Sequence, residues 1–473
     1  MPRNPATQDL TQGSVGRHIM NLAVPGMLTN LMTFSTTLVD MMWVGRISPE
    51  AIAAITTHQY IWFLFSILNQ MIGQGSVTLI ARSYGSGDRR RSAEVLGETF
   101  FFKLVVAFIV MGIGLLTMAP AYRLFGITDE TVFKYGMQYS GIMFLATPLL
   151  FSTFTLKTGF RAVGAATQLF WVSAMTMMIN LVLDPFLIFE RIDFTVPLIN
   201  YHFQSAGFGL EVAGAAYASV LAFAITFVTT LFLFLTGRTF IKLSVRDLFS
   251  PSMDTARKIL KIGLPPAAGN SLEHFSNVLI GSAVNTYGTT VYAAQGVNNM
   301  LQRLIQFSIM GFSWSTITMV GQNLGASEVQ RAEKSVNRSA AIIAGVLFLV
   351  AVLFYFAAPS IAALFMPVRD DASRETVEWI IRILRVNCFL YLPLGLNRVY
   401  RAVFEGSGDT RPVFWSSAAT TWGLQIPLIL TGVYIMRIGE PYFIWWIMVA
   451  GNAAAAVILY AMFRRGGWKH HTV

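Results

Sequence analysis

Long apolar runs separated by short polar segments recur along the whole chain. Each run is long enough to cross the hydrocarbon core of a bilayer as a helix, which takes roughly 17–25 residues. The runs lie near residues 19–44, 55–81, 96–118, 136–156, 168–189, 212–236, 259–286, 291–320, 339–361, 380–397, 412–436 and 441–463. This pattern predicts an all-α integral membrane protein with twelve transmembrane helices.

The segments between the runs alternate in charge. Counted from the first, the even-numbered segments are basic, whereas the odd-numbered ones contain few bases and are often acidic, as in 190–211 and 370–378. Basic loops tend to stay on the cytoplasmic side, so both termini are predicted to be cytoplasmic. The basic residues of the even-numbered segments are Arg82, Arg89, Arg90, Arg91, Lys157, Arg161, Arg238, Lys242, Arg246, Arg257, Lys258, Lys261, Arg331, Lys334, Arg338, Arg398, Arg401 and Arg411.

The two halves of the chain match each other at one constant offset of 240 residues. Six spans per half give both copies the same orientation, so the repeat is parallel, about an axis along the membrane normal. We expect two six-helix lobes related by a parallel pseudo-two-fold repeat, an architecture that suits an alternating-access transporter. The offset aligns Leu22–Pro25 with Ile262–Pro265, Gly85–Asp88 with Gly325–Glu328, and Arg161–Val163 with Arg401–Val403.

The longest basic loop, Arg238 to Lys261, separates the two halves. The first 17 residues are polar and lack an apolar core followed by a cleavage site, so no secretory signal is predicted. The predicted parts are a cytoplasmic N-terminal segment (1–18), an N-lobe (19–237), a cytoplasmic linker (238–257), a C-lobe (258–463) and a cytoplasmic tail (464–473).

Composition supports the membrane assignment and excludes several other classes. The 473 residues are 54% hydrophobic and 12% charged, whereas soluble domains carry about 25% charge. The net charge of +10 follows from the basic cytoplasmic loops, so no nucleic-acid partner is expected. The single cysteine, Cys388, excludes an intramolecular disulfide. No phosphate-binding loop and no metal-ligand spacing of histidines is present, so neither an enzyme nor a cofactor is predicted.

The first apolar run contains one acidic residue, Asp40. A carboxylate inside a spanning helix costs about 2.5–3.5 kcal/mol on insertion scales, so it suggests a functional site. The alternative is a carboxylate at the water interface, because Asp40 lies shortly before Gly45 and Arg46.

A second polar group at a matching depth favours the functional interpretation. Asn180 and Asp184 are four residues apart on one face of the fifth span, and Ser219 lies at a comparable depth in the sixth. Carboxylate, amide and hydroxyl oxygens suit a hard cation such as Na⁺. Two adjacent carboxylates are difficult to ionise together, so the pair can equally hold a proton. The alternative is that Asn180 and Ser219 only join helices, while Asp184 caps a break before Pro185.

The second half has a polar cluster of its own. Glu273 and His274 lie in the middle of the seventh span, and Arg303 lies in the middle of the eighth. A Glu–Arg ion pair and a role in ion or substrate coupling are both open, because a buried charge needs a partner. Bases within the membrane are expected to be few, with Arg303 chief among them.

Further candidates come from soft side chains and prolines. Methionine adapts to varied apolar shapes, although ordinary packing is the simpler explanation for most of these residues. Prolines at matching places in both halves are helix interrupters and candidate bending points. The substrate-cavity candidates are Met27, Met32, Phe34, Thr37 and Met177, and the bending candidates are Pro25, Pro265 and Pro266.

This ordered set of features resembles the multidrug and toxic compound extrusion (MATE) family of secondary transporters over residues 15–463. The resemblance implies twelve helices in two lobes that export amphipathic, often cationic compounds in exchange for Na⁺ or H⁺. The motifs that carry it are 22–25 through Asp40 to 44–45, 84–88 with 324–328, 161–164, Asn180 to Pro185, 214–219 and 263–265.

The resemblance also suggests residue roles and a branch. Asp40, Asn180, Asp184 and Ser219 match the N-lobe cation site, with Ser219 where a threonine is familiar. Glu273 matches a glutamate of the NorM-like branch, but Leu394 stands where that branch has an aspartate. This departure favours the DinF-like branch, with coupling through the N-lobe.

The expected protein is therefore an antiporter of the plasma (inner) membrane with no cofactor besides its coupling ion. Its partners are small amphipathic substrates and membrane lipid, and transporters of this kind commonly act as monomers. The alternative is a lipid-linked oligosaccharide flippase, which would need a basic cavity for an anionic pyrophosphate.

Overall fold

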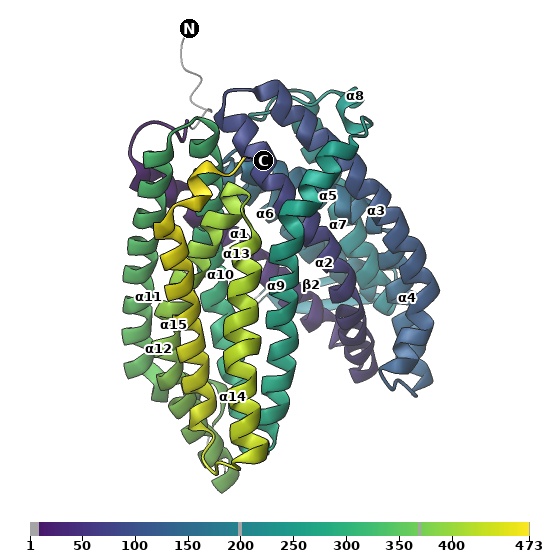
Figure 1. The fold of residues 1–473 in the computed structure, drawn as a ribbon. Coiled ribbons are helices and arrows are strands. Elements are labelled where there is room, and N and C mark those ends of the chain that lie inside the picture. Colours follow the sequence, from purple (N-terminus) through teal and green to yellow (C-terminus); the bar gives the residue numbers. More distant parts are fainter. Residues whose placement is uncertain (1–8, 197–200, 368–369, 473) are drawn as a thin grey trace. The chain divides into compact units, whose positions relative to one another are not determined.

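The computed structural model describes residues 9–196, 201–367 and 370–472, which are almost entirely helical (Figure 1). The predicted segment 1–18 therefore lies partly outside the described residues. The elements are α1 (Val15–Val44), α2 (Pro49–Gly85), α3 (Arg89–Leu124), α4 (Glu130–Leu145), α5 (Thr147–Ala162), α6 (Ala166–Ile188), β1 (Arg191–Val196), β2 (Tyr201–Ala206), α7 (Glu211–Leu235), α8 (Val245–Leu248), α9 (Met253–Asn285), α10 (Thr289–Gly325), α11 (Val329–Phe365), α12 (Asp371–Ser407), α13 (Arg411–Ser417), the π-helical η1 (Ala418–Gln425), α14 (Ile426–Leu430), the π-helical η2 (Thr431–Ile435), α15 (Tyr442–Arg465) and the 3₁₀-helical η3 (Gly467–His470).

Helices cover all twelve predicted spans. Within the described residues, ten helical spans are long and apolar enough to cross a membrane, and the bent pair α4–α5 makes an eleventh. The twelfth is α9, whose 33 residues include Glu273, His274 and two prolines that lower its hydropathy. The prediction of an all-α membrane protein with twelve spans is confirmed.

The span predicted at 136–156 is two helices rather than one. α4 ends at Leu145, α5 begins at Thr147, and their axes differ by 53°. A proline in the first turn of α5 explains the bend, because it has no N–H to continue the hydrogen bonding of α4.

The connection predicted between residues 190 and 211 also contains regular structure. β1 and β2 form an antiparallel pair, with Arg191 opposite Ala206 and Ile192 opposite Ser205. Residues 197–200, which connect β1 and β2 in the sequence, lie outside the described residues.

The expected helix interrupters do not interrupt their helices. Pro25 lies inside a continuous α1, and Pro265 and Pro266 lie inside a continuous α9. Each proline still removes one backbone donor and weakens the local helix. Their role as bending points stays a prediction.

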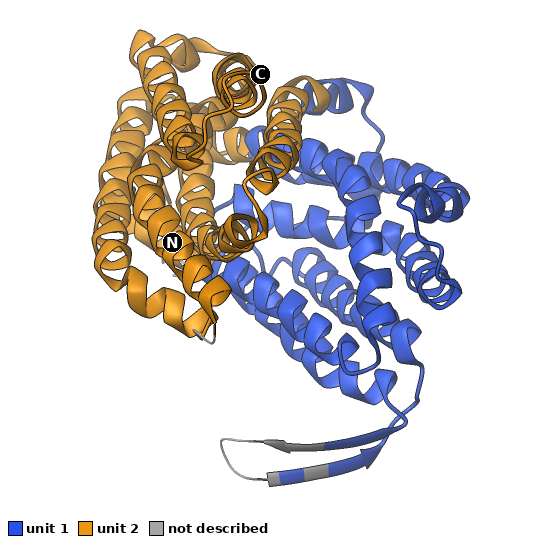
Figure 2. Cartoon of the chain, turned by 90° about the horizontal axis from the view of Figure 1, so that it is seen from below, with its two compact units in different colours: residues 1–8, 28–80, 88–259 blue, residues 9–27, 81–87, 260–473 orange. Residues whose placement is uncertain are grey.

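The chain divides into two compact units (Figure 2). Unit 1 comprises the described residues of 28–80 and 88–259, and unit 2 comprises those of 9–27, 81–87 and 260–473. The first part of α1 and the end of α2 thus group with the second half of the chain. The lobe boundaries drawn from the sequence stay a prediction.

The repeat reappears in the packing of the helices. In unit 1 a Cβ on Gly75 would lie 2.2 Å from the carbonyl oxygen of Ile259, so only glycine allows this approach. In unit 2 the Ser315 hydroxyl donates to the carbonyl oxygen of Ile19 at 3.3 Å. Ser315 lies 240 positions after Gly75, and Ile259 lies 240 positions after Ile19. The offset seen in the sequence therefore corresponds to a repeated structure.

A second contact relates the repeats to each other within unit 2. A Cβ on Gly85 would lie 1.9 Å from the carbonyl oxygen of Gln322, and a Cβ on Gly325 would lie 2.1 Å from that of Arg82. The two glycines are equivalent at the offset of 240, and so are their two partners. The ends of α2 and α10 therefore pack reciprocally, backbone against backbone.

Candidate cation and substrate site

Close packing of α6 against α7 in unit 1 prepares the predicted cation site. A Cβ on Gly214 would lie 2.4 Å from the carbonyl oxygen of Leu187, so the two backbones approach closely at one end. Toward the other end, the hydroxyls of Thr176 and Thr226 hydrogen-bond at 2.9 Å. Small residues and hydroxyl pairs of this kind hold membrane helices together. The side chains between these two contacts are thereby brought face to face.

The four residues predicted to converge do lie together in unit 1. The Asn180 amide donates to Asp184 Oδ1 at 3.2 Å and to Ser219 Oγ at 3.5 Å. The carboxyl groups of Asp40 and Asp184 are close enough to interact electrostatically. A proton or a cation bound to one of two neighbouring carboxyl groups relieves their mutual repulsion. The arrangement can therefore carry a proton, and its role in coupling stays a prediction.

Three buried oxygens of this group accept no hydrogen bond from any described residue. They are Asp40 Oδ1, Asn180 Oδ1 and Asp184 Oδ2. Asn180 is 2% exposed and Asp184 is fully buried, so bulk water does not reach these two residues. Buried acceptors without donors are costly unless a cation or a proton meets them. Carboxylate and amide oxygens are also suitable ligands for Na⁺.

A small cavity of about 20 Å³ adjoins Asp40, which is room for about one water or one ion. Thr37, one of the predicted substrate-cavity residues, lines it together with Gln59 and Tyr139. Sequence analysis did not select Gln59 or Tyr139, because neither stands out within its apolar run. Tyr139 also packs edge-on against His58, with ring centroids 5.0 Å apart.

An apolar cluster lies against this site. Trp43 and Val44 of α1, Ile188 of α6, and Val212 and Ala215 of α7 are all buried there. Apolar cover of this kind lowers the local dielectric, which strengthens the interaction of a cation with the carboxylates.

In unit 2, Glu273 is surrounded by donors. Its carboxylate accepts from Arg398 at 2.8 Å, from Arg401 Nη1, and from the Ser417 hydroxyl at 3.2 Å. Arg401, which is 2% exposed, also donates to Asn270 at 2.8 Å. Glu273 is thus internally neutralised, in contrast to Asp40 and Asp184.

The predicted grouping of Glu273, His274 and Arg303 differs from the observed one. Arg303 is exposed on α10, and the arginines that pair with Glu273 belong to α12. His274 is exposed beside Glu273 on α9. The ion pair was therefore a sound expectation, but Arg303 is not the partner. The sequence could not show which helix faces α9.

The other substrate-cavity candidates are found in both units. Met27 packs against Gly311 of α10 in unit 2, where a Cβ on that glycine would lie 2.5 Å from Met27 Cγ. Met32, Phe34 and Met177 are half-buried residues of unit 1. Their contact with substrate stays a prediction.

Several bases lie on the long helices rather than in loops, while the expectation of few bases within the membrane itself stays a prediction. Lys157 and Arg161 were assigned to a connecting segment, but both lie in α5, and Lys157 is buried. Arg398 and Arg401 likewise lie in α12 rather than in a loop. Lys103 of α3 is 1% exposed and had not been selected at all. Its isolation within the apolar run 96–118 was the available signal.

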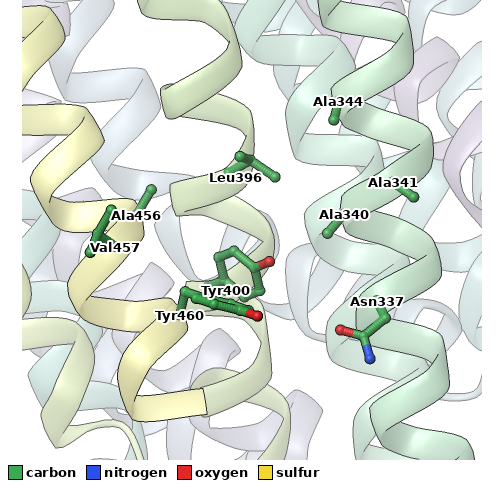
Figure 3. A pocket seen from close by; sticks show the side chains of 9 residues that line it. All are labelled: Asn337, Ala340, Ala341, Ala344, Leu396, Tyr400, Ala456, Val457 and Tyr460. Atoms are coloured by element: carbon green, nitrogen blue, oxygen red, sulfur yellow. The ribbon is translucent and has the colours of Figure 1, made fainter. Parts of the chain in front are cut away.

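A separate groove of about 470 Å³ lies among α11, α12 and α15 in unit 2 (Figure 3). Its walls are mostly small and apolar, and the rings of Tyr400 and Tyr460 lie 5.3 Å apart within it. The residues that line it are Asn337, Ala340, Ala341, Ala344, Leu396, Tyr400, Ala456, Val457 and Tyr460. It contains none of the predicted cation-site or substrate-cavity residues.

Comparison with protein-family models identifies the chain. The model of the MatE family matches residues 25–186 and 265–431, which together make up well over half of the chain. The chain belongs to the MatE family. The two matched segments begin 240 residues apart, in agreement with the repeat. Members of this family are transporters rather than enzymes, and this member is a multi-pass membrane protein.

Similar proteins cover nearly the whole MatE chain. A probable multidrug resistance protein YoeA from Bacillus subtilis is 27% identical, with 97% of this chain and 95% of that protein covered. The multidrug export protein MepA from Staphylococcus aureus is 23% identical, with coverages of 95% and 94%. A protein named FAD transporter from Shewanella oneidensis is 22% identical, with 90% of each covered.

Solved structures show the same fold. One, described as the outward-facing conformation of a multidrug resistance MATE family transporter, matches with a TM-score of 0.84 at 22% identity. A MOP superfamily transporter from Pyrococcus furiosus matches with a TM-score of 0.85 at 21% identity. In both matches 100% of each chain is covered.

Proposed function

We propose that this MatE protein is a secondary active antiporter that exports amphipathic, often cationic organic compounds in exchange for H⁺ or Na⁺ by alternating access. The names of YoeA and MepA support the multidrug part of the proposal. The observation that carries the antiport part is the group of three buried oxygens without donors on Asp40, Asn180 and Asp184.

The proposed roles follow from this arrangement. Asp40 and Asp184 bind the coupling ion, while Asn180 and Ser219 orient them through the Asn180 amide. The substrate contacts Met27, Met32, Phe34, Thr37 and Met177. Pro25, Pro265 and Pro266 allow α1 and α9 to bend, because each proline lacks a backbone donor.

The proposed organisation is an N-lobe at 19–237 and a C-lobe at 258–463, joined by a cytoplasmic linker at 238–257. The N-terminal segment and the tail at 464–473 lie on the cytoplasmic side of the inner membrane, in accordance with the basic loops. The working unit is a monomer, and coupling through the N-lobe is the DinF-like behaviour.

The transport cycle uses the competition between cation and drug. A cation entering from outside binds the oxygens of Asp40 and Asp184 and removes their mutual repulsion. α1 then bends near Pro25, which displaces the methionine-bearing face and releases the drug outward. When the cation leaves toward the cytoplasm, the carboxylates regain their negative charge and attract the next cationic substrate.

The test is ethidium export from proteoliposomes with a proton gradient or a sodium gradient imposed separately. The wild type is compared with Asp40→Asn and with the control Asp193→Asn, an exposed carboxylate on β1. We expect one of the two gradients to drive export in the wild type and in the control, but not in Asp40→Asn. Export by Asp40→Asn with unchanged ion dependence would contradict the proposal.

The flippase alternative is strengthened by one observation. The buried Lys103 and Lys157 supply basic groups within the helix bundle of unit 1. If neither gradient moves ethidium through folded and correctly inserted protein, translocation of a lipid-linked pyrophosphate is the next activity to measure.

A further inference from the structure

Two lysines of unit 1 are buried among the helices. Lys103 of α3 is 1% exposed and Lys157 of α5 is 8% exposed. A lysine in a spanning helix ordinarily extends its ammonium toward the aqueous interface. Both ammonium groups are instead held inside the helix bundle, although burying them without compensation is costly.

The two lysines belong to one cluster. Lys103 Nζ and Thr158 Oγ1 lie 3.6 Å and 3.8 Å from the point where a Cβ on Gly73 would be, so the missing side chain leaves space beside both. Arg161 is one helical turn from Lys157 on α5 and is close enough to both lysines for their like charges to interact. Three positive groups therefore surround a small region, together with the Thr158 hydroxyl, which donates to the carbonyl oxygen of Phe154 at 2.9 Å.

No acidic side chain compensates the two lysines. Among the described residues, neither Lys103 nor Lys157 forms an ion pair or a hydrogen bond, although Lys157 lies 5.7 Å from the centre of the Phe223 ring. The carboxylates near the start of α3 have other partners, which are Arg90 for Asp247 and Arg91 for Glu98.

The equivalent position in unit 2 shows what compensation would look like. Arg401 is the counterpart of Arg161 at the offset of 240, and it pairs with Glu273. The counterpart of Glu273 is Thr33, which carries no charge. The other arginine that pairs with Glu273, Arg398, corresponds to Thr158, so the first half keeps one of the two arginines and has no carboxylate at the position of Glu273.

We propose that Lys103 and Lys157, together with Thr158 and Arg161, bind the phosphate or carboxylate group of an organic anion. The ammonium and guanidinium groups supply charge-assisted hydrogen bonds. The Thr158 hydroxyl can supply another by turning away from the Phe154 carbonyl oxygen to which it donates here. Arg161 is partly exposed near the end of α5, so we expect an anion to enter the cluster from this end of the helix. That this anion is cargo rests on the proposed transport function, which would then extend to anionic and zwitterionic amphipathic compounds.

Binding to the purified protein in nanodiscs tests the site without requiring transport. The probes are riboflavin 5′-phosphate and riboflavin, which share one fluorescent ring system and differ by a single phosphate. We expect the wild type to bind the phosphate ester about ten-fold more tightly, or about 1.4 kcal/mol. The ratio compared below is the dissociation constant of riboflavin divided by that of riboflavin 5′-phosphate. A ratio near one in the wild type would overturn the proposal.

Variants assign the preference to the cluster. The combined change Lys103→Gln and Lys157→Gln should bring the ratio close to one, while Lys103→Arg with Lys157→Arg should keep most of it. The matched control Lys134→Gln removes an exposed lysine of α4 and should leave the ratio unchanged. If the glutamine pair folds and retains the full ratio, the site is elsewhere. If that pair does not fold, the single Lys157→Gln variant is measured, and a full ratio in it has the same meaning.

The lipid of the nanodisc identifies the source of the anion. Discs of phosphatidylcholine alone are compared with discs that also contain phosphatidylglycerol. Phosphatidylglycerol can compete for the site. If it weakens the phosphate preference of the wild type but changes nothing in the glutamine pair, the lipid head group occupies the anion site. An equal preference in both supports a site for soluble organic anions. Ethidium export is measured separately, so loss of phosphate binding and loss of antiport are distinguishable.

Discussion

Asp184 and Glu273 are carboxylates on membrane helices, one in each half of the chain, and their surroundings differ. Asp184 lies near the carboxyl group of Asp40 and accepts from the Asn180 amide, and one of its oxygens has no donor among the described residues. Glu273 accepts from two arginines and a serine. Only the first arrangement still has capacity for a cation, because the charge of Glu273 is already compensated.

The repeated fold therefore does not carry repeated chemistry. Packing contacts such as Gly85 with Gln322 recur at the offset of 240, whereas Asp40 and Asp184 correspond to Ile280 and Leu424. Backbone packing fixes the helix arrangement in both halves, but polar side chains are free to diverge. One half can thus specialise in ion coupling while the other provides internal stability.

The largest effect is expected from Asp184→Asn. The amide keeps the shape of the side chain but cannot carry the charge that binds a cation or releases a proton. We expect gradient-driven ethidium export to fall by at least about ten-fold, corresponding to about 1.4 kcal/mol of lost interaction. Export from proteoliposomes is the measurement, and Asp193→Asn is the exposed control. If Asp184→Asn exports ethidium at the wild-type rate, Asp184 does not bind the coupling ion and does not differ from Glu273 in this respect.

Glu273→Gln should affect stability rather than coupling. The substitution leaves the buried Arg401 with a neutral partner, and losing one partner of such a pair costs about 3 kcal/mol. We expect a lower apparent melting temperature in detergent with an unchanged ion dependence of export. If the ion dependence changes while stability does not, Glu273 belongs to the coupling site.

Gly85→Ala and Gly325→Ala test the feature that the halves share. Each added methyl would meet a backbone carbonyl oxygen at about 2 Å, so the helices must move apart. Overpacking of this kind costs about 1–3 kcal/mol. Both variants should lower the apparent melting temperature by similar amounts. Gly112→Ala in α3, where nothing lies within 4 Å of the added methyl, is the control. Unequal decreases in melting temperature for Gly85→Ala and Gly325→Ala would show that the two helix contacts are not equivalent.

The smallest effect is expected at the helix caps. Asp129 caps α4 and Asp370 caps α12, each by accepting backbone N–H groups of the first turn. Asp129→Ala and Asp370→Ala each remove a side-chain acceptor from the first turn of a helix. Both should therefore lower the apparent melting temperature by a small and similar amount.

The cap on α12 should also respond to pH. Hydrogen bonds with the side chain and the backbone amide of Ser373 hold the pKa of the Asp370 carboxyl below its usual range. Its contribution is therefore present above the ordinary aspartate pKa of about 3.9 and is lost as the pH falls through the lowered value. The difference in melting temperature between the wild type and Asp370→Ala should shrink in acid. A constant difference would mean that the charge of the cap does not matter.

The sequence determined the membrane fold of this MatE protein. Apolar runs must bury their backbone hydrogen bonds as helices in a bilayer, so the twelve apolar runs could be located in the sequence. The repeat was visible because residues at backbone contacts, such as Gly85 and Gly325, are constrained in both copies. Asp40, Asn180 and Asp184 were selected because polar residues inside a membrane are costly.

Only the tertiary structure decided which side chains meet. The bend between α4 and α5, the partners of Glu273 and the burial of Lys103 depend on how helices rotate about their axes and pack. Hydropathy gives the position of a residue along a helix, but not the neighbour that its side chain faces. The basic cluster around Lys157 therefore remained hidden in the sequence, where it looked like part of a cytoplasmic loop.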